Sequence, residues 1–194
     1  ADRALRALGF ARGSVGERFL ALADDARWRY DDDDTGRDRA VADMNRWLDR
    51  ARGRVPLDFP GAPAWCLDVR VRRLDATEIA ANRPGFRALP TPTTAGSYVV
   101  DLRDIARRPS WTLPSVVHHE LLPGHLLQLP LEAAADAHPL RVQWLGAFTE
   151  AWATYAEDHA ASDGAFADRP ELQLGLLHWL LFRALRGLAD TGLH

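Results

Sequence analysis

The spacing of apolar side chains along the chain predicts a largely helical protein. Between residues 36 and 52, apolar side chains recur every three or four positions, at Val41, Met44, Trp47, Leu48 and Ala51. This period places them on one face of an amphipathic helix, and we expect that face to belong to the core. Ser14-Val15-Gly16-Glu17 is typical of a capping box and predicts a shorter helix through Leu22.

The last part of the chain is also predicted to be helical. Thr112-Leu113-Pro114 fits a helix start, because proline is well tolerated in the first turn. Asp168-Arg169-Pro170-Glu171 predicts another start, since its Asp and Glu have the spacing of a capping box. We expect this helix to end near Gly192. Trp179 and its aliphatic neighbours make it apolar nearly all round, which is typical of a central helix or an interface helix.

Two segments have the character of β-strands. Residues 64–71 alternate apolar and polar positions, and residues 97–102 are rich in β-forming side chains. A loop rich in Pro, Thr and Gly over residues 83–96 separates them, so we expect them to pair as a small antiparallel sheet. The predicted fold class is therefore mainly α, with one antiparallel strand pair.

Composition narrows the functional classes. The chain has 194 residues, of which 47% are hydrophobic and 26% charged, an ordinary balance for a globular protein. Its formal charge of −3 excludes a polybasic protein that binds nucleic acid mainly through phosphate contacts. Cys66 is the single cysteine, which excludes a disulfide framework and a Cys-rich zinc site. All 24 basic residues are arginine, so lysine nucleophiles and Schiff bases are excluded as well.

The sequence also indicates where the protein acts. The longest apolar run, residues 174–182, is too short to span a bilayer. The first twenty residues lack the uninterrupted apolar stretch of a signal peptide. We therefore expect a cytoplasmic protein that has no membrane partner and no nucleic-acid partner.

Three of the seven histidines fall within eight residues, in His118-His119-Glu120-Leu121-Leu122-Pro123-Gly124-His125. Imidazole is the commonest metal ligand among side chains, so this segment predicts a metal site. On a straight helix, however, His119 and His125 would lie about 120° apart around the axis, too far round to bind one ion. Pro123 lacks an N–H group and clashes with the carbonyl of His119, while Gly124 permits a sharp turn. We expect the chain to bend here and to carry His125 back toward His119.

The third ligand is expected to be a carboxylate from another helix. Glu150 lies 25 residues after His125, which leaves room for a connection and a returning helix. It is flanked by Phe148 and Trp152, and an unpaired carboxylate in such an apolar stretch would be costly. Glu157 follows seven residues later on the same helix face, either as a second carboxylate of the site or as a surface charge.

These segments resemble the DUF885 family, a widespread bacterial family similar to the gluzincin metallopeptidases. The resemblance rests on motifs in the same order along the chain, at residues 119–128, 150–157, 183–186 and 190–194. The family usually has glycine where this chain has Ala151. The resemblance implies a helical zincin-like scaffold in which His119, His125 and Glu150 bind Zn²⁺. It also implies that Glu120 is the catalytic base, and that the chain corresponds to only the C-terminal half of such a protein.

The predicted reaction is hydrolysis of a peptide or small amide substrate by a zinc-activated water. Glu120 takes the proton of this water and returns it to the leaving amine. The tetrahedral oxyanion needs a further donor, for which the candidates are Tyr155, Arg186 and His194. Each candidate also has a structural interpretation, and Arg186 is equally well spaced to pair with Asp190.

Two other interpretations stay open. Two histidines and one carboxylate also form the facial triad of non-haem iron enzymes. Fe²⁺ is therefore the alternative metal, in an oxygenase, a lyase or a cyclase that acts on a small metabolite. The chain could instead be a metal-binding interaction domain, and a second copy or a partner chain is expected to cover the cleft.

The predicted organisation is one compact domain. Residues 1–58 are expected to form its N-terminal helical segment, and residues 59–194 its metal-binding catalytic region. The isolated histidines His138, His159 and His178 lack neighbouring ligands in the sequence, so we expect them to be structural.

Overall fold

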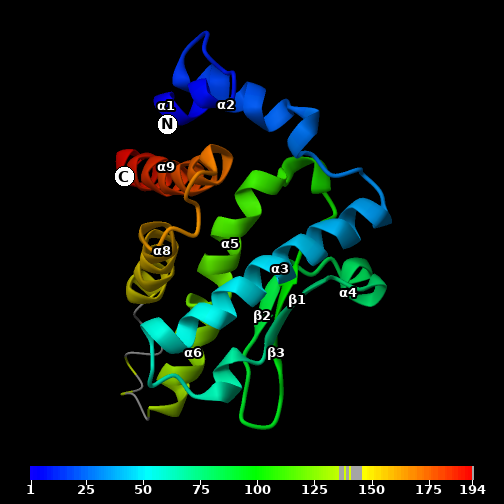
Figure 1. Ribbon diagram of the computed structural model, residues 1–194. Helices are drawn as coiled ribbons and strands as arrows, with labels where there is room; N and C mark the ends of the chain where they lie inside the picture. Colours follow the sequence, from blue (N-terminus) through cyan, green and yellow to red (C-terminus); the bar gives the residue numbers. More distant parts are fainter. Residues whose placement is uncertain (136–137, 139, 141–145, 194) are drawn as a thin grey trace.

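The computed structural model describes residues 1–135, 138, 140 and 146–193. It is mainly helical, as predicted, and has a small sheet beside α3 (Figure 1). The helices are α1 (Asp2–Ala7), α2 (Val15–Asp24), α3 (Asp34–Asp58), α4 (Ala76–Ala80), α5 (Leu113–Glu120), α6 (His125–Ala134), α8 (Gly146–Ser162) and α9 (Pro170–Gly192). The strands are β1 (Val69–Arg73), β2 (Phe86–Ala88) and β3 (Gly96–Val100). In the described part of the chain, no helix has both the length and the apolar character that a membrane crossing needs.

The sheet has the strand order β1-β3-β2, and its pairing differs from the prediction. β1 runs parallel to β3, with Val69 opposite Gly96. β2 runs antiparallel to β3, with Phe86 opposite Val99. The predicted antiparallel pair of the first and second strand segments is therefore wrong. Parallel neighbours need a long crossover, and here α4 and β2 lie within it, β2 in the segment predicted as a loop.

The first predicted strand is also too long. Residues Ala64–Leu67 form a 3₁₀ helix, and β1 begins only at Val69. Cys66 is fully buried whereas its neighbours Trp65 and Leu67 are half-buried, the reverse of the predicted alternation. Four residues are too few for their periodicity to distinguish a 3₁₀ turn from a strand.

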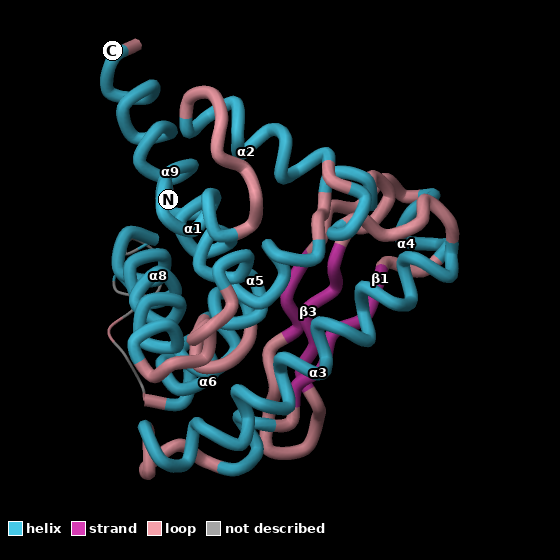
Figure 2. The backbone as a smooth tube through the Cα atoms, turned by 45° about the horizontal axis from the view of Figure 1, so that its top comes forward, coloured by secondary structure: helices cyan, strands magenta, loops and turns pink. Residues whose placement is uncertain are grey.

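α3 supports the sheet along its edge (Figure 2). Its predicted apolar stripe is buried or half-buried, and the helix is longer than predicted at both ends. Asp33 caps its N-terminus by accepting a hydrogen bond of 2.7 Å from the Gly36 N–H. Asn45 exchanges two hydrogen bonds of 3.0 Å with the backbone of Val71 in β1. α3 therefore covers backbone groups of an edge strand that would otherwise be unpaired.

α6, α8 and α9 pack against α5. α1 packs against α9 (Figure 1). The capping box at Ser14 and Glu17 is formed as predicted. The one predicted at Asp168 is not: α9 begins at Pro170, but Arg169 is its N-cap and makes no side-chain capping bond. α5 and α6 carry the clustered histidines, and this packing places α8 beside them.

Candidate metal centre

The chain bends between α5 and α6, as predicted. α5 ends at Glu120 and α6 begins at His125, so the two helices present His119 and His125 to each other. The centroids of the two imidazole rings are 4.9 Å apart. A Cβ atom on Gly124 would lie 1.9 Å from the carbonyl oxygen of His119, so only glycine fits this turn. The Trp152 indole N–H donates a hydrogen bond of 2.9 Å to the carbonyl of Pro123 and joins the turn to α8.

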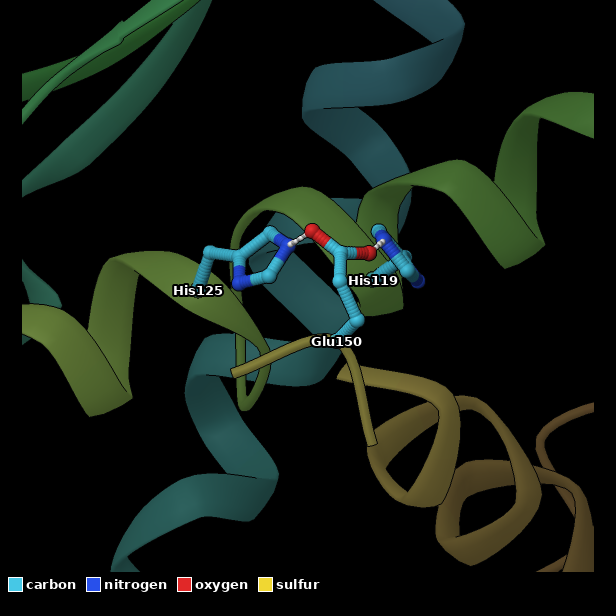
Figure 3. Close-up of side chains that lie close together, drawn as sticks. All are labelled: His119, His125 and Glu150. Atoms are coloured by element: carbon cyan, nitrogen blue, oxygen red, sulfur yellow. Dashed lines mark ion pairs between the residues drawn. The ribbon is translucent and has the colours of Figure 1, made fainter. Parts of the chain in front are cut away.

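Glu150 lies between the two imidazole rings (Figure 3). Its Oε2 atom is 3.4 Å from Nε2 of His119, and its Oε1 atom is 3.5 Å from Nε2 of His125. One ligand atom from each of the three residues falls within 4.8 Å of the others, so together they could hold a metal ion. Ligand atoms on tetrahedral zinc lie about 3.3 Å apart, since each bond is about 2.0–2.1 Å long. The three side chains therefore fit a zinc ion with little movement.

A buried carboxylate orients His119 from behind. Glu157 is 0% exposed, and its Oε1 atom lies 2.8 Å from Nδ1 of His119. Glu157 also accepts hydrogen bonds from the Ser115 hydroxyl and from Nη2 of Arg183. Nη2 of Arg183 also lies 3.1 Å from this Nδ1 atom. When the imidazole donates its Nδ1 proton to the carboxylate of Glu157, the lone pair of Nε2 faces Glu150. Of the two roles left open for Glu157 by the sequence, the surface charge is wrong.

His125 shows the strongest sign of a missing partner. Its side chain is 0% exposed, and neither ring nitrogen has a hydrogen-bond partner among the described residues. Burial, followed by the positive charge of Arg87, lowers its pKa to about 3. The ring is therefore neutral at neutral pH and keeps a lone pair on one nitrogen. Buried polar atoms without a partner are rare, and a cation next to Nε2 would provide one.

Glu120 lines the same cavity as His119 and Glu150. This cavity has a volume of about 630 Å³ including its opening to solvent. Its Oε2 atom accepts a hydrogen bond from Nη1 of Arg87 in β2, and its Oε1 atom has no partner in the described part of the chain. Tyr98 of β3 lines the cavity too. Burial and the charge of Glu120 both raise the pKa of its hydroxyl, which therefore stays protonated and able to donate.

Comparison with known proteins shows the family of the chain. The whole chain, residues 1–194, matches a family described as "Bacterial protein of unknown function (DUF885)". The chain belongs to the DUF885 family. It is similar to a solved structure described as the putative lipoprotein from Colwellia psychrerythraea, with 32% sequence identity and a TM-score of 0.85. The match covers 100% of this chain and 33% of that one, so this DUF885 chain spans a third of that protein rather than half. No curated protein matches it.

The three candidate oxyanion donors of this DUF885 protein differ in their position relative to the cavity. Tyr155 is 50% exposed and does not line the cavity, because it stacks on His159 with ring centroids 5.7 Å apart. It follows Glu150 by five residues, which is about 140° around α8. Arg186 does line the cavity, beside Phe182, and does not form the alternative ion pair with Asp190. His194 lies outside the described residues.

Several residues of the site were not predicted from the DUF885 motifs. Tyr98 and Arg87 come from strands, where nothing in their own spacing indicates a site. Ser115 precedes His119 by four residues on α5, so the helical period alone could have indicated that both reach the same neighbour. His118 is buried, with Nδ1 3.1 Å from the carbonyl of Leu122, and belongs to the core rather than to the triad.

Proposed function

We propose that this DUF885 protein is a zinc-dependent hydrolase that cleaves a peptide or amide bond. The observation that carries the proposal is the position of Glu150, whose two oxygens face Nε2 of His119 and Nε2 of the buried, otherwise unpartnered His125. A Glu next to the first histidine, at the mouth of the same cavity, supports hydrolysis rather than another metal-dependent reaction. The zincin-like scaffold is part of this proposal.

The ligands in this proposal are Nε2 of His119, Nε2 of His125 and the carboxylate of Glu150. Zinc, when bound, supplies an activated water whose pKa is about 7. Glu157 holds the proton of His119 on Nδ1 and thereby keeps Nε2 available as a ligand.

The remaining chemistry belongs to side chains of the cavity. Glu120 accepts the proton of the attacking water on Oε1, while Arg87 holds Oε2, and Glu120 then returns the proton to the leaving amine. The hydroxyl of Tyr98 takes the role of oxyanion donor for which Tyr155 was first considered, because it lines the cavity and stays protonated.

The experiment measures metal content and hydrolysis on the same preparations. We expect about one zinc per chain and cleavage of a quenched fluorescent peptide library. Glu120→Gln should keep the zinc and lose at least about a hundredfold in turnover, the typical contribution of a general base. Asp104→Asn, which changes an exposed carboxylate, should match the wild type.

Two outcomes would contradict this proposal. Full turnover by zinc-loaded Glu120→Gln would exclude Glu120 as the base. Stoichiometric iron with oxygen uptake, and no peptide cleavage, would support the non-haem iron interpretation instead, because the same ligands suit Fe²⁺.

A further inference from the structure

Within the described residues, two of the three arginines that line the cavity beside the triad have no carboxylate partner. Arg108, Arg183 and Arg186 line it, together with the carboxylates Glu120, Glu150 and Glu157. Arg183 is paired with Glu157 and Arg87 is paired with Glu120, so these two carboxylates are neutralised inside the protein. Glu150 faces the two histidines. Arg108 and Arg186 are left without a carboxylate partner.

Both guanidinium groups are free to bind a ligand. Among the described residues, neither side chain donates a hydrogen bond or forms an ion pair, and Arg186 only lies over the ring of Phe182 at 5.8 Å. Asp101 feels the charge of Arg108 but already pairs with Arg103 at 2.6 Å. A guanidinium group presents its N–H donors as a planar fork that matches the two oxygens of a carboxylate.

Arg183, which also lines the cavity, has a further donor. Nη1 of Arg183 is buried and has no hydrogen-bond partner in the described part of the chain, although Nη2 of the same group binds Glu157. Buried donors in folded proteins are almost always satisfied by protein or by ordered water, so this N–H group is available to a water or a ligand at Arg183.

We propose that Arg186 and Arg108 form a subsite that binds a carboxylate of the substrate next to the candidate metal centre. The cavity also has an apolar part, because Val116, Trp179 and Phe182 line it as well. The substrate class is therefore an amide whose carboxylate stands beside an apolar group, as at the C-terminus of a peptide that ends in an apolar residue. An acidic side chain within a peptide would offer the same chemistry.

This inference deepens the proposed hydrolase function and rests on it for the position of the cleaved bond, but carboxylate binding can be tested without turnover. The first measurement compares kcat/KM for an N-blocked peptide that ends in phenylalanine, as the free acid and as the amide. We expect the free acid to be preferred by at least about tenfold, the effect of one charge-assisted hydrogen bond. Arg186→Gln and Arg108→Gln should each reduce this preference several-fold.

The control is Arg107→Gln, next to Arg108 in sequence. Arg107 is 85% exposed, does not line the triad cavity and lies 3.7 Å from Asp104. It should keep the preference of the wild type. A second peptide pair, both amidated and differing as Asp against Asn, distinguishes an acidic side chain from a C-terminus as the source of the carboxylate. Preference for the Asp peptide alone supports the subsite with a side chain as its occupant.

The second measurement is independent of catalysis. Titration of N-acetyl-phenylalanine, and of its amide, into the wild type and Arg186→Gln is followed by NMR. Binding of the acid that depends on Arg186 supports the subsite even if no peptide is cleaved, in which case only the hydrolase proposal fails. Equal cleavage and equal binding of acid and amide overturn the subsite and leave the hydrolase intact. Inorganic phosphate that competes as strongly as the acid would also overturn the assignment to carboxylates.

Discussion

Two clusters of histidine and carboxylate groups each include one residue of α8. Their ligand atoms are similarly spaced, but their neighbouring charges differ. One is the triad of His119, His125 and Glu150. In the other, Nε2 of His159 lies 3.3 Å from Asp58 and 3.3 Å from Asp163. Both clusters bring three potential ligand atoms within 4.8 Å of one another. Distance alone therefore does not distinguish a metal site from a structural ion-pair network.

The difference is the presence of a cation. Arg54 bridges the second cluster, with Nε 3.0 Å from Asp58 and Nη2 3.1 Å from Asp163. Burial acts to raise the pKa of Asp58, but the hydrogen bonds from Arg54 and His159 outweigh it and the pKa is lowered. At the triad, no arginine of the described residues contacts Glu150, and Arg183 binds Glu157 on the far side of His119. An arginine therefore bridges the carboxylates of the second cluster, whereas at the triad Arg183 lies 3.1 Å from Nδ1 of His119 and leaves the carboxylate of Glu150 unpaired by arginine.

The largest expected effect is loss of the metal from the triad. His119→Ala and His125→Ala should each weaken zinc binding by more than about a hundredfold, the upper range for removing even a supporting partner of a ligand. Zinc per chain, measured by mass spectrometry after dialysis, checks this, with circular dichroism to verify folding. His118→Ala and His159→Ala should keep about one zinc. Loss of zinc from His159→Ala alone would place the ion in the second cluster.

The turn at Gly124 has no equivalent in the second cluster, where His159 and Asp163 lie four residues apart on and just after one helix. Gly124→Ala should displace the carbonyls of His118 and His119, since the new Cβ would collide with both. We expect a loss of about 1–3 kcal/mol in unfolding free energy, as for overpacking, and loss of zinc binding. Gly53→Ala is the matched control: its Cβ meets nothing within 4 Å in an exposed part of α3, so stability should stay equal or rise. Unchanged zinc affinity in Gly124→Ala would show that the bend does not create the site.

Sequence patterns predicted the parts of this site that depend on neighbours along the chain. The Pro123-Gly124 bend and the helix that carries Glu150 follow from local steric rules and from periodicity. The strand directions could not be predicted from such local patterns, because parallel or antiparallel pairing depends on the path of the connection between the strands. Tyr98 and Arg87 were missed for the same reason: only the tertiary fold brings β2 and β3 to the end of α5.

Glu157, the hydrogen-bond partner of His119, provides a further test of the difference between the two clusters. Glu157→Gln preserves the shape of the side chain but can place an amide donor against Nδ1 of His119, which destabilises the tautomer that the triad needs. Zinc affinity should fall about 10–100-fold, the usual cost of losing a partner behind a metal ligand. Asp163→Asn makes the same chemical change in the second cluster and should leave zinc affinity unchanged. Calorimetric zinc titration of both variants measures the difference, and equal affinities would remove Glu157 from the site.

The smallest expected effect is the creation of a second, weak site. Arg54→Gln removes the cation that bridges Asp58 and Asp163, while the ligand atoms of these residues and of His159 stay close together. If the arginine is what excludes a metal there, the variant should bind a second zinc ion that the wild type does not bind, with lower affinity than the first. Arg50→Gln, one turn earlier on α3, keeps Arg54 and should bind only one. A second equivalent in calorimetric titration that disappears in Arg54→Gln/His159→Ala would establish that the two clusters differ by one guanidinium group. A single equivalent in Arg54→Gln would instead mean that ligand type, two imidazoles against one, makes the distinction.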